Sequence, residues 1–563
     1  MVATDLDFSL CRLPPFQHQR EDTLEMINHP WFFIASECRT GKTKIVIDAA
    51  HFLFNTGAIN RVLVVAPAPV RDVWYDPDLG EIAKHSWHTV PGTVTEFHSP
   101  IRSWFWGDPR DQRVGPRRLE WYITNYEFIG RSKARLNQLF AVCGARTLLV
   151  LDESSFVKNW SAEQTKACLQ LRRSCARVVL INGTPLFHSP LDLFSQGNIL
   201  HPSILDCKFV THFKSRYGIQ TPILTFGGKP MMSKWNKPVL KVEKWTNLPD
   251  LQQRFAPYTV RRLQAECLDL PPKLDPVVLS APLEPETWRM YKGMRDDLVV
   301  WMKNNLVARS GSAAIRVMRL SQITSGFLSG IENVDLEYNE GDTFDLPGSF
   351  LDGLTLEAGG AEALNQQALH FQKAGPPKAQ AIGREKLDVL LWFLGRRLEE
   401  DPNLHVVVWC LYRAELFRMM KEVQEKYPQF TTGAIHGGQK HDERIAALAL
   451  LKPETSPAGP VFVGGIEGTG SFGLDMTAAH TCVTMSSGYS PGRVAQTLDR
   501  VYGPGQKHPV AYFNIIATGP KGQRTIDHAI EVARRAGQDV AEWTASAWVK
   551  ALIDEVPATA SSI

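Results

Sequence analysis

Residues 31–43 read Trp-Phe-Phe-Ile-Ala-Ser-Glu-Cys-Arg-Thr-Gly-Lys-Thr, and their pattern gives the strongest indication of an α/β fold. Its apolar first half predicts a buried strand, and residues 43–54 after it predict a helix. A strand that runs into a tight turn and then a helix leaves backbone N–H groups pointing at an anion. Lys42 would then neutralise the terminal phosphates of a nucleotide, and Thr43 would hold Mg²⁺. The alternative interpretation is an ordinary strand–turn–helix corner.

A pair of carboxylates follows a later apolar strand, in the stretch Leu148-Leu-Val-Leu-Asp-Glu153. At the carboxyl edge of a parallel sheet, Asp152 would reach the metal ion and Glu153 would polarise a water for attack on the γ-phosphate. A solvated acidic helix cap is the alternative, and the presence of the Lys42 motif upstream weakens it.

Apolar, β-branched segments alternate with helical ones in both halves of the chain, which indicates two parallel sheets covered by helices on both faces. The second α/β half begins near Lys386. The stretch 330–383 between the halves reads as an irregular insertion or linker, and residues 200–300 show little strand periodicity. The expected strands after the first are 61–66, 119–125, 147–151, 178–181, 406–409, 460–463, 481–484 and 510–513.

Three further segments carry candidate chemistry. Gly183-Thr-Pro185 ends a strand with a small hydroxyl that would sense the phosphate site, or is a simple turn. Residues 468–475 are Gly-rich, which suits close approach to ATP or to a nucleic-acid backbone, or a flexible loop. Gln496, Asp499 and Arg500 share one helix face, so that Arg500 would stabilise transferring phosphate charge, or the face is merely solvated.

Basic residues interleave with aromatic ones between Phe209 and Trp245. Such a stretch would track phosphates, and a solvated surface with buried Trp anchors explains the same pattern.

The composition of the chain limits the number of domains, the kind of nucleic-acid site and the compartment that we expect. With 563 residues, 44% hydrophobic and 21% charged, the chain is predicted to hold two to four globular domains. The net charge of +3 requires any nucleic-acid site to be a local basic lining. The nine Cys residues form no CxxC pair, which disfavours a zinc site and suits a reducing compartment. We find no apolar run of about 18 residues and no signal-peptide pattern at Met1, so we expect a cytoplasmic protein.

Together these segments resemble a superfamily-2 helicase and, more narrowly, the Swi/Snf-type DNA-dependent ATPases, especially compact phage or bacterial members. The resemblance extends from about residue 12 to 516. The segments that carry it beyond the loop and the Asp-Glu pair are 13–17 (LPPFQ), 62–74 (VLVVAPAPVRDVW), 123–127 (ITNYE), 258–262 (YTVRR), 269–273 (DLPPK), 320–327 (LSQITSGF), 473–479 (GLDMTAA) and 496–506.

The resemblance implies a set of site residues. The implied catalytic residues are Lys42, Asp152, Glu153 and Arg500. The implied ATP-binding residues are Gln17, Arg39, Thr40, Gly41, Lys42, Thr43, Gly473, Asp475, Gln496 and Arg500, with Thr43 and Asp152 for Mg²⁺. The implied nucleic-acid contacts are Pro67, Arg71, Thr124, Asn125, Gly183, Thr184, His436, Gly468 and Thr469.

Two departures from the family pattern stand out. Ser154-Ser155 replaces the usual Ala-His after Asp-Glu. Gly503 stands where the family usually has a second arginine, often the arginine finger. Arg500 or Arg493 would then have to replace it, or hydrolysis would be slow.

The expected architecture is two RecA-like α/β lobes with helical insertions between them. The expected boundaries are 1–200 for the first lobe, 201–260 for its helical or irregular insertion, 261–383 for a linker and helical insertion, 384–520 for the second lobe and 521–563 for C-terminal helices and a tail. The implied activity is ATP hydrolysis with Mg²⁺ that drives translocation on double-stranded DNA, in the host cytoplasm if the protein is phage-encoded. A strand-unwinding helicase or restriction-type motor subunit, and a weakly catalytic nucleic-acid-binding scaffold, are the alternatives.

Overall fold

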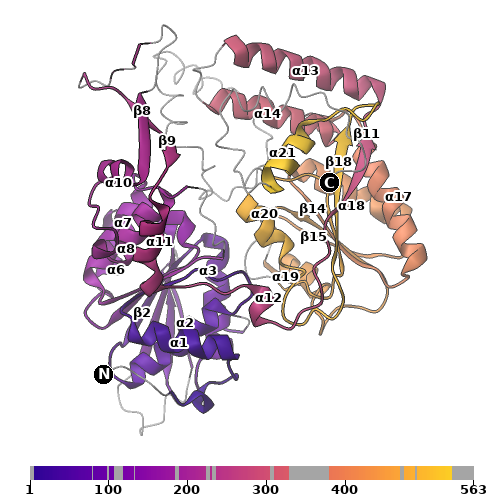
Figure 1. Cartoon of the computed structure of the whole chain (residues 1–563). Helices are drawn as coiled ribbons and strands as arrows, with labels where there is room; N and C mark the ends of the chain where they lie inside the picture. The colour runs from indigo at the N-terminus through magenta and orange to yellow at the C-terminus, as the bar shows by residue number, and fades with distance from the viewer. Residues whose placement is uncertain are drawn as a thin grey trace. The chain divides into compact units, whose positions relative to one another are not determined.

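The computed structural model describes residues 6–78, 80–97, 101–106, 118–131, 133–183, 189–222, 229–230, 232, 236–304, 310–328, 379–439, 441–468, 475–488 and 491–535. The chain divides into two compact units, Met1–Asp269 and Leu270–Ile563. Each contains one large sheet with helices around it (Figure 1). Among the described helices, none is both long and apolar enough to cross a membrane.

The first unit contains an eight-stranded sheet in the order β10-β1-β7-β6-β2-β5-β3-β4. Its strands pair in parallel, except that β4 is antiparallel to β3. The strands are β1 (Trp31–Ile34), β2 (Arg61–Ala66), β3 (Gly92–Glu96), β4 (Arg102–Trp106), β5 (Leu119–Asn125), β6 (Thr147–Leu151), β7 (Arg177–Ile181) and β10 (Thr259–Val260). The helices are α1 (Gln17–Asn28), α2 (Lys42–Asn55), α3 (Ala68–Tyr75), α4 (Glu81–His85), α5 (Tyr126–Arg131), α6 (Lys133–Phe140), α7 (Glu163–Ser174), α8 (Asp192–Leu200), α9 (Pro202–Leu205), α10 (Val210–Tyr217), α11 (Leu248–Phe255) and α12 (Gln264–Cys267).

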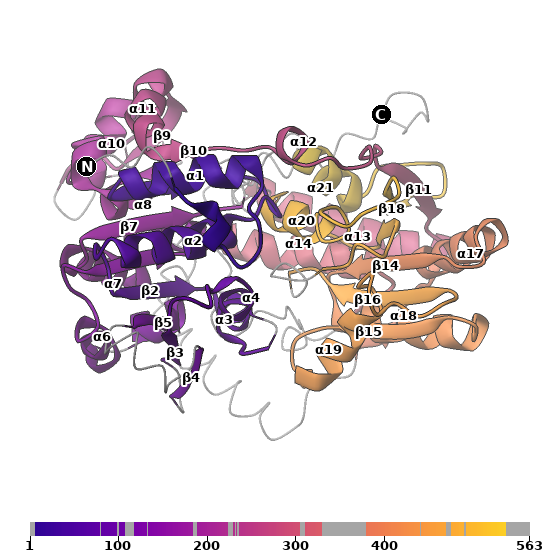
Figure 2. The same ribbon diagram turned by 90° about the horizontal axis from the view of Figure 1, so that it is seen from below.

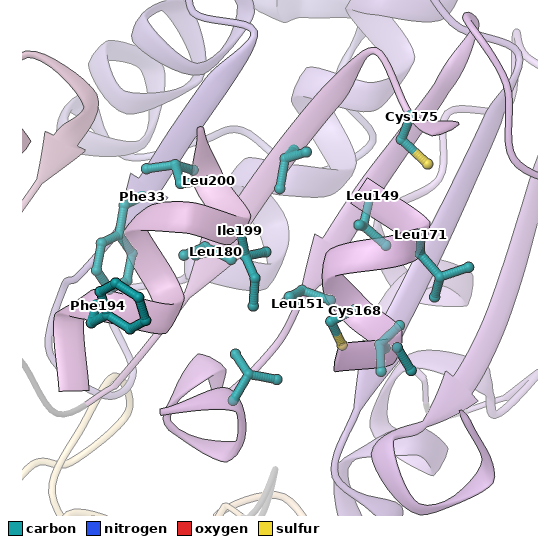
Figure 3. Close-up of a cluster of buried hydrophobic side chains, with 14 of the residues drawn as sticks. Phe33, Leu149, Leu151, Cys168, Leu171, Cys175, Leu180, Phe194, Ile199 and Leu200 are labelled. Carbon is teal, nitrogen blue, oxygen red and sulfur yellow. The ribbon is translucent and has the colours of Figure 1, made fainter. Parts of the chain in front are cut away.

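The core of the first unit forms because its central strands are apolar on both faces. In β6 all five residues are buried, and Leu149 and Leu151 share one face with Leu180 of β7. Helices α7 and α8 cover that face with Leu171 and Ile199, as Figure 3 shows. A sheet that is buried on both sides presents its functional groups only at the ends of its strands.

The second unit contains a six-stranded, fully parallel sheet in the order β11-β18-β17-β14-β16-β15. The large-sheet strands are β11 (Val277–Pro282), β14 (His405–Cys410), β15 (Thr431–Ile435), β16 (Val461–Ile466), β17 (Thr481–Thr484) and β18 (Ala511–Thr518), and β12 (Phe327–Leu328) pairs with β13 (Gln380–Ala381). The helices are α13 (Pro285–Asn304), α14 (Ser310–Thr324), α17 (Glu385–Glu400), α18 (Arg413–Lys426), α19 (His441–Ala449), α20 (Pro491–Leu498) and α21 (Ile526–Arg535).

Alternation along β14 builds both cores of this sheet. Val406 and Val408 face a cluster closed by α17 and α18, whereas Val407 and Trp409 face a cluster closed by α19. Figure 2 shows α17 and α18 beside these strands. The prediction of two parallel-sheet lobes is confirmed.

The insertion at 201–260 differs from the expectation of little strand character. Its described residues contain three short α-helices and one 3-10 turn, and also an antiparallel pair of strands, β8 (Gly218–Pro222) and β9 (Leu240–Trp245). The sequence of these strands shows no alternating apolar pattern that would have predicted them, because most of their described side chains are exposed or only half-buried. Strands within 259–282 join the large sheets, β10 in the first unit and β11 in the second. The domain boundaries themselves stay predictions.

Candidate nucleotide-binding site

The loop between β1 and α2 has the backbone of a phosphate cradle. Gly41 caps α2 with φ of 83°, and Arg39 has φ of 63°. A Cβ atom on Gly41 would lie 2.0 Å from Nε2 of Gln19, so the position requires glycine for space as well as for conformation. The first turn of α2 therefore begins with free N–H groups at the site where Lys42 and Thr43 stand.

The side chain of Lys42 turns back onto its own loop. Its Nζ donates to the carbonyl oxygen of Glu37 at 2.8 Å, and the Thr40 hydroxyl donates to the same oxygen at 2.9 Å. One carbonyl thus holds both side chains. If a phosphate entered the cradle, the Lys42 ammonium would form a hydrogen bond with it in place of this carbonyl. A charged phosphate is a stronger acceptor than a neutral carbonyl oxygen.

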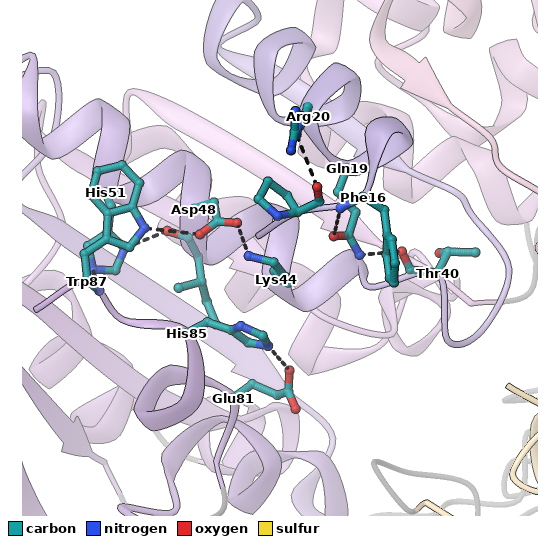
Figure 4. A network of polar contacts seen from close by, with 12 residues as sticks. Phe16, Gln19, Arg20, Thr40, Lys44, Asp48, His51, Glu81, His85 and Trp87 are labelled. Carbon is teal, nitrogen blue, oxygen red and sulfur yellow. Dashed lines mark hydrogen bonds and ion pairs between the residues drawn. The ribbon is translucent and has the colours of Figure 1, made fainter. Parts of the chain in front are cut away.

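Helix α1 supports the loop from one side, as Figure 4 shows. His18 Nε2 lies 2.8 Å from the carbonyl oxygen of Thr40, and Gln19 Nε2 donates to the same oxygen at 3.2 Å. Gln19 Oε1 accepts from the backbone N–H of Phe16 at 3.0 Å. Gln17, the residue that the resemblance implied, is exposed and donates to Glu21 at 3.2 Å. Its role in ATP binding stays a prediction.

Helix α2 is fixed by a buried polar network behind the loop (Figure 4). Lys44 Nζ pairs with Asp48 at 2.5 Å, and Trp87 Nε1 donates to the other oxygen of Asp48 at 3.2 Å. His51 accepts from the backbone N–H of Trp87 at 3.3 Å, and burial lowers the pKa of His51 to about 4. These groups satisfy one another away from water, so the helix that presents Lys42 is rigidly placed.

The segment 259–264 supports the loop from another side. The backbone N–H of Glu37 donates to the carbonyl oxygen of Arg262 at 2.9 Å, and the N–H of Arg262 donates to Ser36 Oγ at 3.1 Å. The backbone N–H of Gln264 donates to the Glu37 carboxylate at 2.8 Å, and Nε2 of Gln264 donates to the Cys38 carbonyl oxygen at 2.7 Å. Six residues of connecting chain therefore define the shape of the loop.

The Arg262 side chain locks this segment onto α1. Its Nη2 lies 2.7 Å from Asp22, whose side chain is 0% exposed, and 2.9 Å from Glu21. Burial raises the pKa of Asp22, and the Arg262 guanidinium opposes that rise.

Asp152 lies at the carboxyl end of β6 and is buried. Trp74 Nε1 donates to its Oδ2 at 2.7 Å, and the N–H of Glu153 donates to its Oδ1 at 2.9 Å. Burial raises the pKa of Asp152, opposed by the Trp74 hydrogen bond and by the charge of Lys42. Strands β1 and β6 lie on either side of β7 and are parallel to it, so the loop after β1 and the carboxylate after β6 stand at the same edge of the sheet.

Glu153 follows in a left-handed conformation, with φ of 47°. This strained backbone marks the turn where the strand ends and a short 3-10 helix begins (Ser154–Val157). The unusual Ser154 is fully buried and donates to Gln196 Oε1 of α8 at 2.7 Å. The departure at position 154 thus ties the Asp-Glu turn to the helix that follows β7.

The predicted nucleic-acid contacts of the first unit differ in their burial and in their hydrogen-bond partners. Pro67 is buried at the end of β2, and Thr124 is fully buried in β5. Asn125 caps α5 by accepting from the N–H of Phe128 at 2.8 Å. Arg71 is 15% exposed and pairs with buried Glu96 at 2.7 Å. Gly183 is buried and directly follows Asn182 after β7, and Thr184 lies outside the described residues.

In the second unit, Arg500 and Gln496 are both buried, at 8% and 7% exposure. Asp475 accepts from the Thr477 hydroxyl at 2.9 Å. Asp499, on the same predicted face, pairs with Lys273 at 2.9 Å, which connects two segments of the family pattern. Gly473 and Thr469 lie outside the described residues.

The two remaining predicted contacts of the second unit follow strands. His436 comes after β15 and is half-buried, and its N–H donates to Gln439 at 2.9 Å. Gly468 follows β16 with φ of 93°, and a Cβ atom at this position would meet no other atom within 4 Å. Gly503 is buried, and its carbonyl accepts from the N–H of Gln506 at 3.0 Å. The described residues contain no cluster of three or more His, Cys, Asp and Glu that could hold a metal ion.

The sequence interpretation missed five residues that contact the loop or Asp152: His18, Gln19, Trp74, Arg262 and Gln264. Trp74 and Arg262 stood inside segments that carried the resemblance, but their partners are distant in sequence. Gln19 follows Phe16 at the spacing of a helix cap, which was the available signal.

The chain is similar in sequence to a known protein family and to several curated proteins. The family model described as SNF2-related domain matches residues 22–328. The chain is 23% identical over 492 residues to ATP-dependent DNA helicase DDM1 of Arabidopsis thaliana, covering 86% of this chain and 56% of that protein. It is 25% identical over 405 residues to mouse DNA repair and recombination protein RAD54B, covering 70% and 41%. The chain thus spans about half the length of these curated relatives. Among solved structures, a Sulfolobus solfataricus SWI2/SNF2 ATPase core in complex with dsDNA aligns over 98% of this chain and 99% of its own, with 18% identity and a TM-score of 0.38.

Proposed function

Because the chain belongs to the SNF2-related family, we propose that it is a DNA-dependent ATPase that translocates on double-stranded DNA. The observation that carries the proposal is the single site formed by the Lys42 loop and the Asp152-Glu153 turn. Phosphoryl transfer requires groups that bind and neutralise phosphates and a group that orients the nucleophile. The site supplies backbone N–H groups, an ammonium and two carboxylates at strand ends.

The residues present fit a magnesium ion. The Thr43 hydroxyl and the buried Asp152 carboxylate are hard oxygen ligands, and Mg²⁺ commonly binds through one or two such side chains together with substrate phosphates. A bound Mg²⁺ would neutralise charge on the phosphates. The raised pKa of Asp152 fits this role, because a buried carboxylate gains from a cation beside it.

The other residues have separate tasks. Lys42 would exchange the Glu37 carbonyl for the terminal phosphates. Glu153 would orient and deprotonate the attacking water. Arg500 would supply positive charge to the transferring phosphoryl group, and closure on ATP followed by opening would move the protein along DNA.

Gly503 supports a second candidate, a weakly catalytic scaffold that binds nucleic acid. The missing arginine would cost roughly 10³–10⁵ in rate if no other residue replaced it. A strand-unwinding helicase is a further alternative, which a strand-displacement assay distinguishes from a translocase.

Steady-state ATP turnover with and without duplex DNA tests the proposal. We expect DNA to stimulate turnover and Lys42→Ala to reduce it to background. Lys166→Ala, an exposed lysine of α7, is the matched control and should retain turnover. Wild-type turnover in Lys42→Ala would refute the site, and robust DNA binding without turnover would favour the scaffold.

A further inference from the structure

One short segment of this chain carries a large excess of basic over acidic residues. Residues 208–245 contain eight Lys and Arg residues and a single acidic residue, Glu243. The whole chain carries a net charge of only +3, so the remainder of the protein is net negative. Charge separation of this kind creates a local field that attracts polyanions.

Within this segment, helix α10 is followed by a ribbon of the antiparallel strands β8 and β9, and the base of the ribbon is anchored. Strands β8 and β9 extend beyond α10 and α11, away from the large sheet of the first unit (Figure 1). At the base, Trp245 packs against Phe213 with a ring separation of 6.2 Å, and Thr246 donates to the Tyr217 carbonyl at 2.8 Å. Farther out, an isolated antiparallel bridge joins Met232 and Pro238.

The ribbon has little core of its own. Ile219, opposite Lys244 in the register, is 51% exposed, and Leu240 is 47% exposed. A two-stranded ribbon without a covered face contributes little to stability, so folding alone does not account for its composition. Three described lysines of β9 and of the stretch between β8 and β9 are exposed: Lys229, Lys237 and Lys244.

We propose that the β8–β9 ribbon, through Lys229, Lys237 and Lys244, binds the phosphate backbone of duplex DNA. This surface is separate from the strand-end segments that the resemblance implied, and the inference rests on the proposed DNA-dependent function. Lysines act as point charges on phosphates without reading sequence, which suits a motor that crosses every sequence. The ribbon would hold the duplex while the lobes cycle.

The test compares two triple variants by fluorescence anisotropy on duplexes across a salt series. The ribbon variant is Lys229→Ala, Lys237→Ala, Lys244→Ala. The control variant removes three exposed lysines elsewhere, namely Lys166→Ala, Lys421→Ala and Lys426→Ala. Both variants lose the same formal charge, and thermal unfolding checks that both remain folded.

Each phosphate contact contributes about 0.9 to the slope of log affinity against log salt. We therefore expect the ribbon variant to lower the slope by about 2.7 and to weaken binding at least about tenfold at 0.1 M salt, equally on unrelated duplexes. The control should change the affinity less than about threefold. A ribbon variant that matches the control overturns the inference, even when wild-type protein binds DNA. A wild-type protein without DNA affinity overturns the proposed function instead.

Discussion

Arg262 offers a sharp test of how the nucleotide loop is supported. Arg262→Ala removes the cation that pairs with Asp22 but keeps the backbone hydrogen bonds to Ser36 and Glu37. The carboxylate of Asp22 is 0% exposed, so it would be left charged and buried without its partner. We expect α1 and the loop to loosen as a consequence.

The magnitude follows from the burial of the two partners. Removing one partner of a buried pair costs about 3–5 kcal/mol. Arg262 is 29% exposed, which places the cost near the lower end, at about 3 kcal/mol, because water can reach the site after truncation. Arg61→Ala is the matched control: its pair with Glu120 is 36% and 30% exposed, and such pairs are worth about 1 kcal/mol or less.

Hydrogen exchange of the α1 amides measures this change directly. A loss of about 3 kcal/mol raises their exchange rate by roughly 150-fold, since about 1.4 kcal/mol corresponds to a factor of ten. Asp22→Asn in the Arg262→Ala background should restore much of the protection, because the amide carries no charge. The effect should also shrink at lower pH, where Asp22, whose pKa burial already raises, becomes protonated. Equal exchange in Arg262→Ala and Arg61→Ala would refute the reasoning.

Three further outcomes follow from the site and from the second unit. Glu153→Gln should keep ATP binding and lower turnover by 10²–10⁴, and a loss below about tenfold in a single-turnover assay would exclude it as the base. Arg500→Ala should remove nearly all DNA-stimulated turnover, and an active Arg500→Ala variant would contradict the assignment of the phosphate contact to Arg500. Gly503→Arg should raise turnover if the wild-type protein is slow. Burial raises the pKa of Glu415 to about 7, so the stability of the second unit should fall as pH rises from about 4.3 through 7. Glu415→Gln should flatten that dependence in urea unfolding, and an unchanged slope would show that another group titrates.

The sequence predicted the lobes because their strands are continuous apolar runs. Thr147–Leu151 and His405–Cys410 are buried on both faces, and a strand of that kind leaves a clear hydrophobic record. The β8–β9 ribbon left none, because most of its described side chains are exposed or half-buried, and β9 carries lysines where a buried strand carries valines. Hydrophobic periodicity in a sequence reflects burial of side chains, so it cannot predict a strand whose side chains are exposed.

The candidate site divides in the same way. Lys42, Thr43, Asp152 and Glu153 could be identified because local chemistry at strand ends determines what they do. The supports of these residues depend on contacts between distant segments: Trp74 reaches Asp152 across 78 residues, and Arg262 reaches Asp22 across 240.

The two sheets and the chemical groups at their edges could be predicted from the sequence, since hydrophobic patterning and turn chemistry act over a few neighbouring residues. The folded chain was needed to show that Gln19 contacts the loop, that Arg71 pairs with buried Glu96, and that residues 259–264 support the cradle. These outcomes depend on which groups lose water together, and that depends on how the whole unit packs.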